Sequence, residues 1–232
     1  MFMNQFKFLK NFLIKFLPSK KISIVCILFY IWGIIFAFMN PVLAHFTFSG
    51  GMFLDGIEVK IQMPMDITLD YILNQFIYYL GAVSLGIFLN NLVLMILCIF
   101  SGFALIPVIL IGLFMKMGTT TFFIVEKLGF TGILVLIGSF HIYFEFLAAL
   151  LAIDAFFKFY ISFISSIRQH DITVFKENVL KEFLPIFLRI ILLLAFAAIL
   201  EVFWSTWWVY ILTDHYISWY EFYFGAYSVL LI

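Results

Sequence analysis

Charged residues are scarce in this sequence. Lys and Arg number 13 and Asp and Glu number 13, so that only 11% of the 232 residues are charged and the formal net charge is zero. Hydrophobic residues make up 66%, whereas soluble domains contain roughly 45–50% apolar residues. This composition excludes a soluble globular domain. We expect a polytopic membrane protein whose first partner is the lipid bilayer, and no nucleic-acid partner.

Cysteine is equally rare, since the chain contains only two. Cys26 and Cys98 both lie within apolar runs, where cysteine behaves as a small buried hydrophobic residue. Neither belongs to a pattern of metal ligands or of disulfide-bonded cysteines. We therefore expect no metal site, no cofactor and no disulfide framework.

Long apolar runs predict an all-α fold, namely a bundle of about five membrane-spanning helices. About 20 mainly apolar residues cross a bilayer as a helix. The run 22–39 approaches this length without a charged residue, and the apolar residues 71–116 suffice for two helices. We expect a single transmembrane domain over residues 22–232, with spanning helices near 22–39, 71–98, 103–123, 131–157 and 186–209.

A basic amphipathic segment precedes the first span. Residues 1–21 contain five lysines, five phenylalanines and no acidic residue. A helix of this composition lies at an anionic membrane surface, with its apolar face among the lipid chains. The residues that we expect to contact this surface are Lys7, Lys10, Lys15, Lys20 and Lys21.

The distribution of Lys and Arg predicts the orientation. With five spans and an internal N-terminus, segments 1–21 and 158–189 hold five Lys or Arg each, whereas the external segments hold three in all. Cytoplasmic segments carry the excess of Lys and Arg in membrane proteins. We therefore expect a cytoplasmic N-terminus, an external loop 40–70 and a cytoplasmic loop 158–185. The aromatic segment 217–232 fits either an interfacial belt or a re-entrant helix.

Polar side chains inside the predicted spans are the candidates for a functional site. His141 and Glu145 lie on one face of a helix together with alanines at positions 148, 152 and 155. Glu201 lies on a similar alanine-rich face, and helices in lipid pack through such faces. We predict an intramembrane polar core that contains Asn90 or Asn91, together with His141, Glu145 and Glu201.

Three interpretations of this core are open. It can be a hydrogen-bonded clamp, in which His141 bridges two carboxylates and at least one of them is protonated. It can be a proton or ion pathway, since acids and histidines form relays in membranes. It can be a metal site, although one histidine without a nearby cysteine is a poor ligand set for zinc. We favour the clamp, and we expect Asp154 to snorkel or to pair with Lys158 outside it.

Three segments of this region carry sequence motifs. They are Phe88-Leu89-Asn90-Asn91 followed by Gly102, His141-Ile142-Tyr143-Phe144-Glu145-Phe146-Leu147-Ala148, and Ala197-Ala198-Ile199-Leu200-Glu201-Val202-Phe203. Together they resemble the stage II sporulation protein M family of bacterial and archaeal integral membrane proteins, over about residues 80–205. The chain departs from the family pattern with Ile142 in the place of a glycine and with Met117-Gly118 in the place of Asn-Gly.

The resemblance implies a multi-pass protein of a prokaryotic plasma membrane without catalytic activity of its own. In spore formers the family acts as a scaffold that localises peptidoglycan-degrading partners. We therefore expect a scaffold that recruits other membrane or cell-envelope proteins, or further copies of itself, through segment 1–21, loop 40–70 or the aromatic tail. The alternative is a transporter or permease subunit with a pathway lined by Asn91, His141, Glu145 and Glu201.

Overall fold

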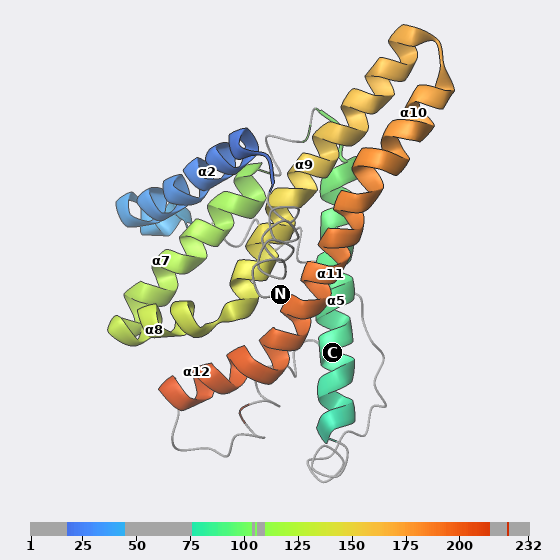
Figure 1. Cartoon of the computed structure of the whole chain (residues 1–232). Helices are drawn as coiled ribbons and strands as arrows, with labels where there is room; N and C mark the ends of the chain where they lie inside the picture. Colours follow the sequence, from blue (N-terminus) through green and yellow to red (C-terminus); the bar gives the residue numbers. More distant parts are fainter. Residues whose placement is uncertain (1–17, 45–75, 104, 106–109, 214–221, 223–232) are drawn as a thin grey trace, which may run out of the picture.

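The fold is all-α, as predicted. The structure, a computed structural model, describes residues 18–44, 76–103, 105, 110–213 and 222. Every regular element in these ranges is helical (Figure 1). Four stretches among them are long and apolar enough to cross a membrane: Lys20–Met39, Ile77–Phe100, Phe140–Gln169 and Ile172–Thr213. The chain is thus a multi-pass membrane protein with about four candidate spans, one fewer than predicted.

The helical elements follow one another closely within the described ranges. Segments with the wider π-helical turn are labelled η. In chain order the elements are α2 (Lys20–Met39), α5 (Phe76–Phe100), η1 (Leu110–Met115), α7 (Lys116–Leu128), α8 (Phe130–Gly138), α9 (Phe140–Gln169), α10 (Ile172–Asn178), η2 (Val179–Phe183), α11 (Leu184–Leu200), η3 (Glu201–Ser205) and α12 (Thr206–Thr213). The predicted spans near 22–39 and 186–209 fall inside such helical stretches, and the described part of 71–98 falls inside α5.

The described part of the predicted span near 103–123 forms η1 and part of α7, which are not among the four candidate spans, and its residues 104 and 106–109 lie outside the described residues. α7 carries Lys116, Lys127 and three consecutive threonines, so that it is too polar to cross hydrocarbon without a partner. The hydroxyl groups of Tyr30 on α2 and Thr121 on α7 lie 2.9 Å apart. α7 therefore places part of its polar face against α2.

The predicted span near 131–157 differs from the structure at both ends. The helix breaks at Ser139, so that α8 has only nine residues. α9 then continues for 30 residues, as far as Gln169. The ring of Phe100, at the end of α5, contacts that of Phe159 in the second half of α9. Between these helices the chain therefore returns to the opposite end of the bundle through η1, α7 and α8.

The segment 158–185, predicted as a cytoplasmic loop between two spans, is a helical hairpin in the structure. His170 follows α9 in the left-handed conformation, with a φ of 51°, and Asp171 precedes α10. The Asp171 carboxylate accepts hydrogen bonds from the backbone N–H and the hydroxyl of Thr173, at 2.8 and 2.7 Å. Such an N-cap begins a helix. The polar stretch was expected to be a loop, but its lysine and glutamate residues are good helix formers.

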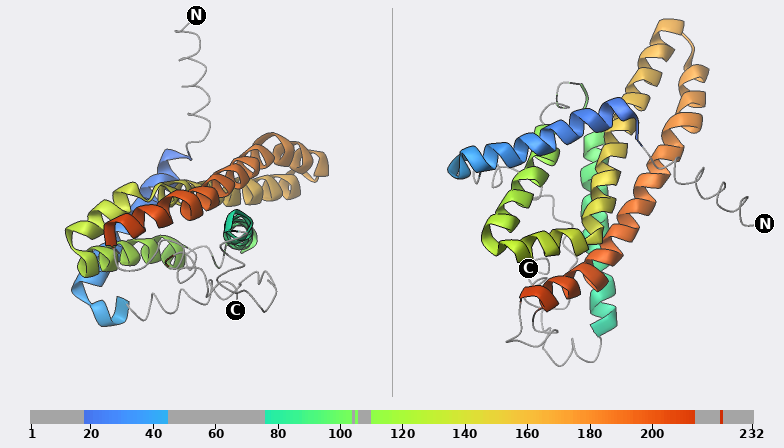
Figure 2. Two further views of the ribbon diagram at one scale, coloured as in Figure 1. Left: turned by 90° about the horizontal axis from the view of Figure 1, so that it is seen from below. Right: turned by 60° about the vertical axis from the view of Figure 1, so that its left-hand side comes forward.

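The core of the bundle lies between α9 and α11, which run side by side (Figures 1 and 2). Ala148 and Ala152 on α9 are fully buried, as are Ala197 and Ala198 on α11. Alanines allow two helices to approach closely, which strengthens their van der Waals contact in lipid. α5 packs against both helices. α5 and α9 hold Asn90, Asn91, His141 and Glu145, and Glu201 begins η3 directly after α11.

A second packing unit consists of α2 with η1 and α7. A Cβ atom at Gly33 would overlap the backbone carbonyl of Met115, and a Cβ at Gly118 would overlap that of Tyr30. Both positions therefore require glycine, because the two backbones touch there. In contrast, a Cβ at Gly81 on α5 would meet no atom within 4 Å.

These glycines give a matched pair of substitutions. We expect Gly118→Ala to lower the free energy of unfolding by roughly 1–3 kcal/mol, the usual range for overpacking. Gly81→Ala should be neutral or slightly stabilising, because alanine costs less conformational entropy in a helix. Thermal unfolding of both variants in one detergent checks this, and equal midpoints for the two would contradict the close contact of α2 with α7.

Candidate functional site

Asn91 and Glu145 join two of the central helices. Nδ2 of Asn91 on α5 donates a hydrogen bond to Oε1 of Glu145 on α9, over 2.7 Å. Both side chains are half-buried. Within a bilayer neither group has bulk water as an alternative partner. The bond therefore restricts how α5 can rotate against α9.

His141 makes the second polar contact between elements of the core. Its Nδ1 lies 2.7 Å from Oγ of Ser205, the last residue of η3. Either atom can donate, depending on the tautomer of the imidazole. The expected bridge from His141 to two carboxylates is not the arrangement found, because Ser205 occupies Nδ1 and Asn91 binds Glu145. Ser205 was not in the predicted core, although its position four residues after Glu201 puts it on the same helix face.

Glu201 is the first residue of η3, which packs against both α5 and α9. Its carboxyl group is close enough to that of Glu145 for the two to interact electrostatically. Among the described residues its side chain has no hydrogen-bond partner, whereas its backbone carbonyl accepts a hydrogen bond from the Thr206 hydroxyl at 2.9 Å. The two acidic residues Glu145 and Glu201 thus lie on elements that pack against each other.

The helix break at Ser139 lies directly beside this core. Where a helix stops, its last carbonyl groups lose their N–H partners, and hydrocarbon supplies no water to replace them. Nε1 of Trp204 donates to the carbonyl of Gly138 at 2.8 Å, and Nε1 of Trp208 donates to that of Leu134 at 3.0 Å. Two tryptophans from η3 and α12 thus satisfy carbonyl groups at the end of α8.

Aromatic stacking holds these tryptophans in place. The Trp204 ring is nearly parallel to those of Phe140 and Trp208, with centroids 5.8 and 6.2 Å away. The Trp208 ring fills the space where a Cβ of Gly138 would lie. The sequence signal for this arrangement is a pair of tryptophans four residues apart, on one face of a helix.

The other predicted residues lie outside this arrangement. Asn90 is half-buried, and its side chain has no hydrogen bond within the described ranges, so the structure brings Asn91 and not Asn90 to Glu145. Lys20 and Lys21 are exposed at the beginning of α2. The remaining predicted lysines, Lys7, Lys10 and Lys15, fall outside the described residues.

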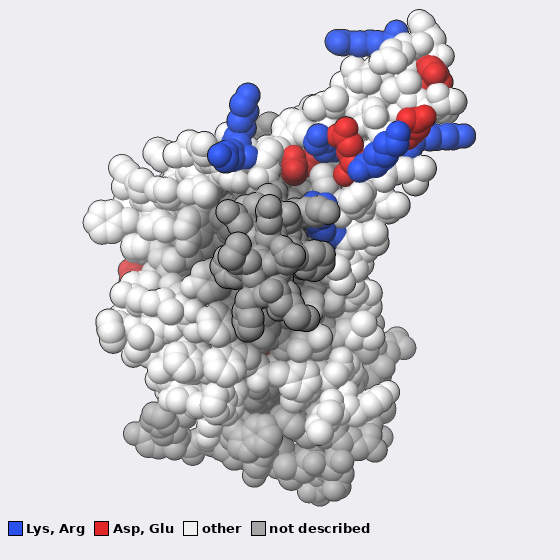
Figure 3. All heavy atoms as spheres, in the orientation of Figure 1, with Lys and Arg blue, Asp and Glu red and all other residues white. Residues whose placement is uncertain are grey.

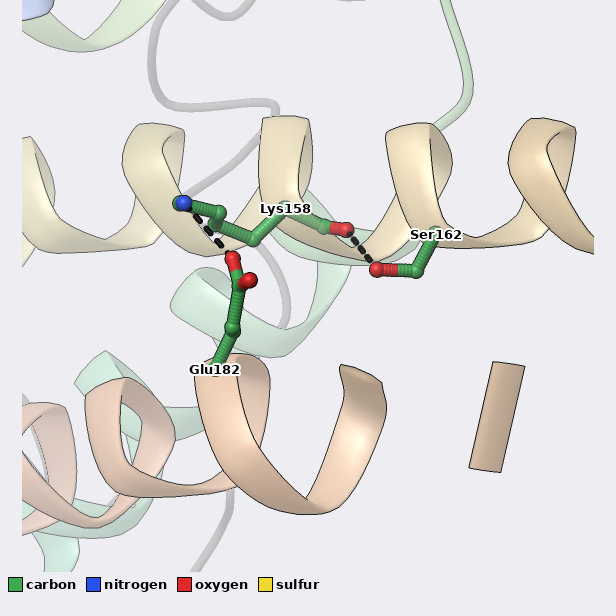
Figure 4. A network of polar contacts seen from close by, with 3 residues as sticks. All are labelled: Lys158, Ser162 and Glu182. Atoms are coloured by element: carbon green, nitrogen blue, oxygen red, sulfur yellow. Dashed lines mark hydrogen bonds and ion pairs between the residues drawn. The ribbon is translucent and has the colours of Figure 1, made fainter. Parts of the chain in front are cut away.

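Asp154 lies apart from the core, three turns further along α9. It interacts electrostatically with Lys158 and Arg189. The ion pair of Lys158 is made instead with Glu182 of η2, at 2.6 Å (Figure 4). The hydroxyl of Ser162 donates to the Lys158 carbonyl at 2.7 Å. The expected ion pair of Asp154 with Lys158 is therefore not formed, and Lys158 instead joins α9 to η2 across the helical hairpin.

The polar side chains of this site can link helices by hydrogen bonds and can bind protons. Carboxyl groups and a histidine inside a membrane are the groups that bind or pass protons there. A metal site is not formed by the described residues, since they contain no suitable group of three or more His, Cys, Asp or Glu side chains. The clamp and the proton pathway are the two interpretations that this geometry serves.

Removal of the His141 imidazole tests the clamp. We expect His141→Leu to lower the free energy of unfolding by about 1–3 kcal/mol, because it leaves the buried Ser205 hydroxyl without its partner. Glu145→Gln should be nearly neutral for folding, because glutamine still offers Asn91 an acceptor. Thermal or denaturant unfolding in detergent measures both. If His141→Leu proved as stable as Glu145→Gln, the contact with Ser205 would contribute nothing to the free energy of unfolding.

Comparison with known proteins does not identify the family of this chain. No protein-family model, no curated protein and no solved structure matches the chain. The resemblance to the stage II sporulation protein M family therefore stays a prediction from three motifs. The function must be inferred from the chain's own residues.

Proposed function

We propose that this chain is a non-enzymatic integral membrane scaffold that binds other membrane or cell-envelope proteins. The observation that carries the proposal is the helical hairpin of α9, α10 and η2. We call its outer part, residues 158–182, the stalk. α9 has 30 residues and is thus about 45 Å long at 1.5 Å per residue, whereas the hydrocarbon layer is about 30 Å thick.

The stalk extends beyond the rest of the bundle (Figure 2). Charged side chains gather over it, while most of the remaining visible surface is uncharged (Figure 3). Charged groups avoid hydrocarbon, which supports an aqueous position for the stalk. The Lys and Arg count of the sequence supports the cytoplasm of a prokaryotic cell as its side of the plasma membrane, with the N-terminus on the same side.

The tip of the stalk is well ordered by its own hydrogen bonds. The Ser166 hydroxyl donates to the carbonyl of Asp171 at 2.8 Å, and the hydrogen bonds from Thr173 lower the pKa of the Asp171 carboxyl. A docking element that is already ordered loses less conformational entropy when it binds. This favours the stalk as a binding element over an unstructured loop.

Large apolar side chains are exposed on the stalk. Ile172 is 66% exposed and Leu180 is 63% exposed, and Ile161 and Ile167 are also exposed. Apolar side chains in lipid need no further partner, but on a part that extends into water they mark an interaction site. The stalk thus combines a rigid frame, charge and apolar contact area.

The double variant Ile172→Ala with Leu180→Ala tests the scaffold function. We expect about tenfold less partner protein to co-purify from native membranes, which corresponds to a loss of about 1.4 kcal/mol in binding. The control is Leu192→Ala, which truncates an exposed leucine of α11 outside the stalk. Unchanged capture by the stalk variant, with the same proteins in the same amounts, would contradict the proposal.

A second candidate is a transporter or permease subunit. It is favoured by the interrupted helix at Ser139 beside Glu145 and Glu201, since discontinuous helices and intramembrane acids line ion sites in transporters. The test is ion or solute flux into liposomes that contain the protein. Flux with wild type but none with a folded Glu145→Gln variant would favour this function over the scaffold.

A further inference from the structure

We propose that the stalk binds an acidic amphipathic helix of a partner protein. The proposal names the class of partner for the scaffold function and rests on that function. Three properties of the stalk carry it: one of its sides is exposed and apolar, this side holds cations that make no ion pair, and it lies away from the bilayer.

The first property begins with three side chains on α10 and η2. Ile172, Lys176 and Leu180 are exposed and follow one another at intervals of four residues. Side chains four residues apart lie one above another on a helix. Lys176 therefore lies between two apolar side chains that are 66% and 63% exposed.

A similar set lies on the second half of α9. Ile164, Ile167 and Arg168 are all exposed. They are spaced as residues i, i+3 and i+4, which are neighbours on a helix surface. Two apolar side chains are thus again combined with a cation.

The two sets lie on the same side of the hairpin. The rings of Phe163 on α9 and Phe175 on α10 contact each other, with centroids 6.0 Å apart, so both point across the hairpin. The next residue on each helix, Ile164 or Lys176, is rotated by about 100°. Because the two helices are antiparallel (Figure 1), both rotations lead to the same side. We call this side the stalk face; it consists of Ile164, Ile167, Arg168, Ile172, Lys176 and Leu180.

The second property is the charge of the stalk face. The Asp171 carboxylate accepts the hydrogen bonds from Thr173. The other two acidic side chains of the stalk are held in ion pairs, at 2.6 and 2.9 Å: Glu182 with Lys158 (Figure 4) and Glu177 with Lys181. Within the described part of the chain, Arg168 and Lys176 make no ion pair. The stalk face therefore presents positive charge beside its apolar side chains.

A complementary ligand needs apolar side chains with acidic side chains next to them. An amphipathic helix offers both along one side, and such helices bind to apolar surfaces through residues spaced by three and four positions. Acidic groups on that helix would pair with Arg168 and Lys176, while its apolar face would cover Ile172 and Leu180. Charge complementarity of this kind selects the partner and its orientation.

The third property, the distance from the bilayer, argues against lipid as the ligand. Arg168 lies ten residues beyond Lys158 at the base of the stalk, and thus about 15 Å further along α9. This distance separates the stalk face from anionic headgroups. A second copy of the chain would bring the same cations together, and segment 1–17 contains lysines but no acidic residue. Like charges across a contact are unfavourable, so an acidic partner fits best.

Two synthetic helical peptides test the proposal on the full chain in nanodiscs of phosphatidylcholine. Both have leucines along one face, with glutamates beside them in one peptide and lysines at the same positions in the other. We expect wild type to bind the acidic peptide about tenfold more tightly than the basic one, with a preference that falls as salt screens the charges. Arg168→Gln combined with Lys176→Gln should lower this preference about fivefold.

Reversal of the charges separates recognition from folding. Arg168→Glu combined with Lys176→Glu should bind the basic peptide more tightly than the acidic one, which a folding defect cannot produce. The matched control is Lys127→Gln, which removes an exposed lysine of α7 outside the stalk and should leave the preference unchanged. The proposal is overturned if wild type binds the two peptides equally or not at all, or if the glutamine double variant keeps the full preference.

Two further measurements test the other occupants. Cys26 and Cys98 are buried, so a fluorescent label can be placed on Ile172→Cys, where aqueous iodide should quench it whether or not phosphatidylglycerol is present. Shielding of the label by this lipid would assign the stalk face to the membrane. A wild-type dimer that Ile172→Ala with Leu180→Ala dissociates, as measured by mass photometry, would assign it to a second copy. Either result overturns the proposal.

The scaffold function fails separately from this proposal. It fails if Ile172→Ala with Leu180→Ala captures the same proteins from native membranes in the same amounts. If that capture is lost but the peptides show no charge preference, the stalk is still a binding element, and only the acidic character of its partner is wrong.

Discussion

The need to satisfy every backbone carbonyl inside a bilayer is the constraint on which the rest of this structure depends. A continuous helix meets it alone, but α8 and α9 are separated at Ser139. The carbonyls of Leu134 and Gly138 receive their hydrogen bonds from the indoles of Trp208 and Trp204. η3 and α12 thus stabilise the break, together with the hydroxyl of Tyr143, which donates to the Leu136 carbonyl at 3.2 Å. The end of α8 and the C-terminal helices stabilise each other.

The same contact brings the polar side chains together. Trp204 and Ser205 are adjacent in η3, so the turn that places an indole on Gly138 also places a hydroxyl on His141. α9 begins just after the break, and Glu145 lies one turn after His141, where it meets Asn91 of α5. The hydrogen bonds to backbone carbonyls and those between polar side chains thus lie in the same small region.

Local sequence was sufficient for some parts of the fold but not for others. Hydropathy predicts the apolar helices, and the alanine face of α9 predicts that Ala148 is buried. It does not show that a polar stretch such as 158–185 continues as helix, because that depends on a partner helix across the hairpin. Nor does it choose between Asn90 and Asn91, or find Ser205 opposite His141. Those contacts depend on the relative rotation of helices that are distant in sequence.

The central claim is that contacts from α5, α9 and η3 form one linked core. A double-mutant cycle between Asn91→Leu and Ser205→Ala tests it most directly, since these residues lie at opposite ends of the core and do not bind each other. If the core is one unit, the two losses of unfolding free energy will be coupled by at least about 0.5 kcal/mol. If they add within about 0.3 kcal/mol, the two hydrogen bonds are independent and the account of a linked core is wrong.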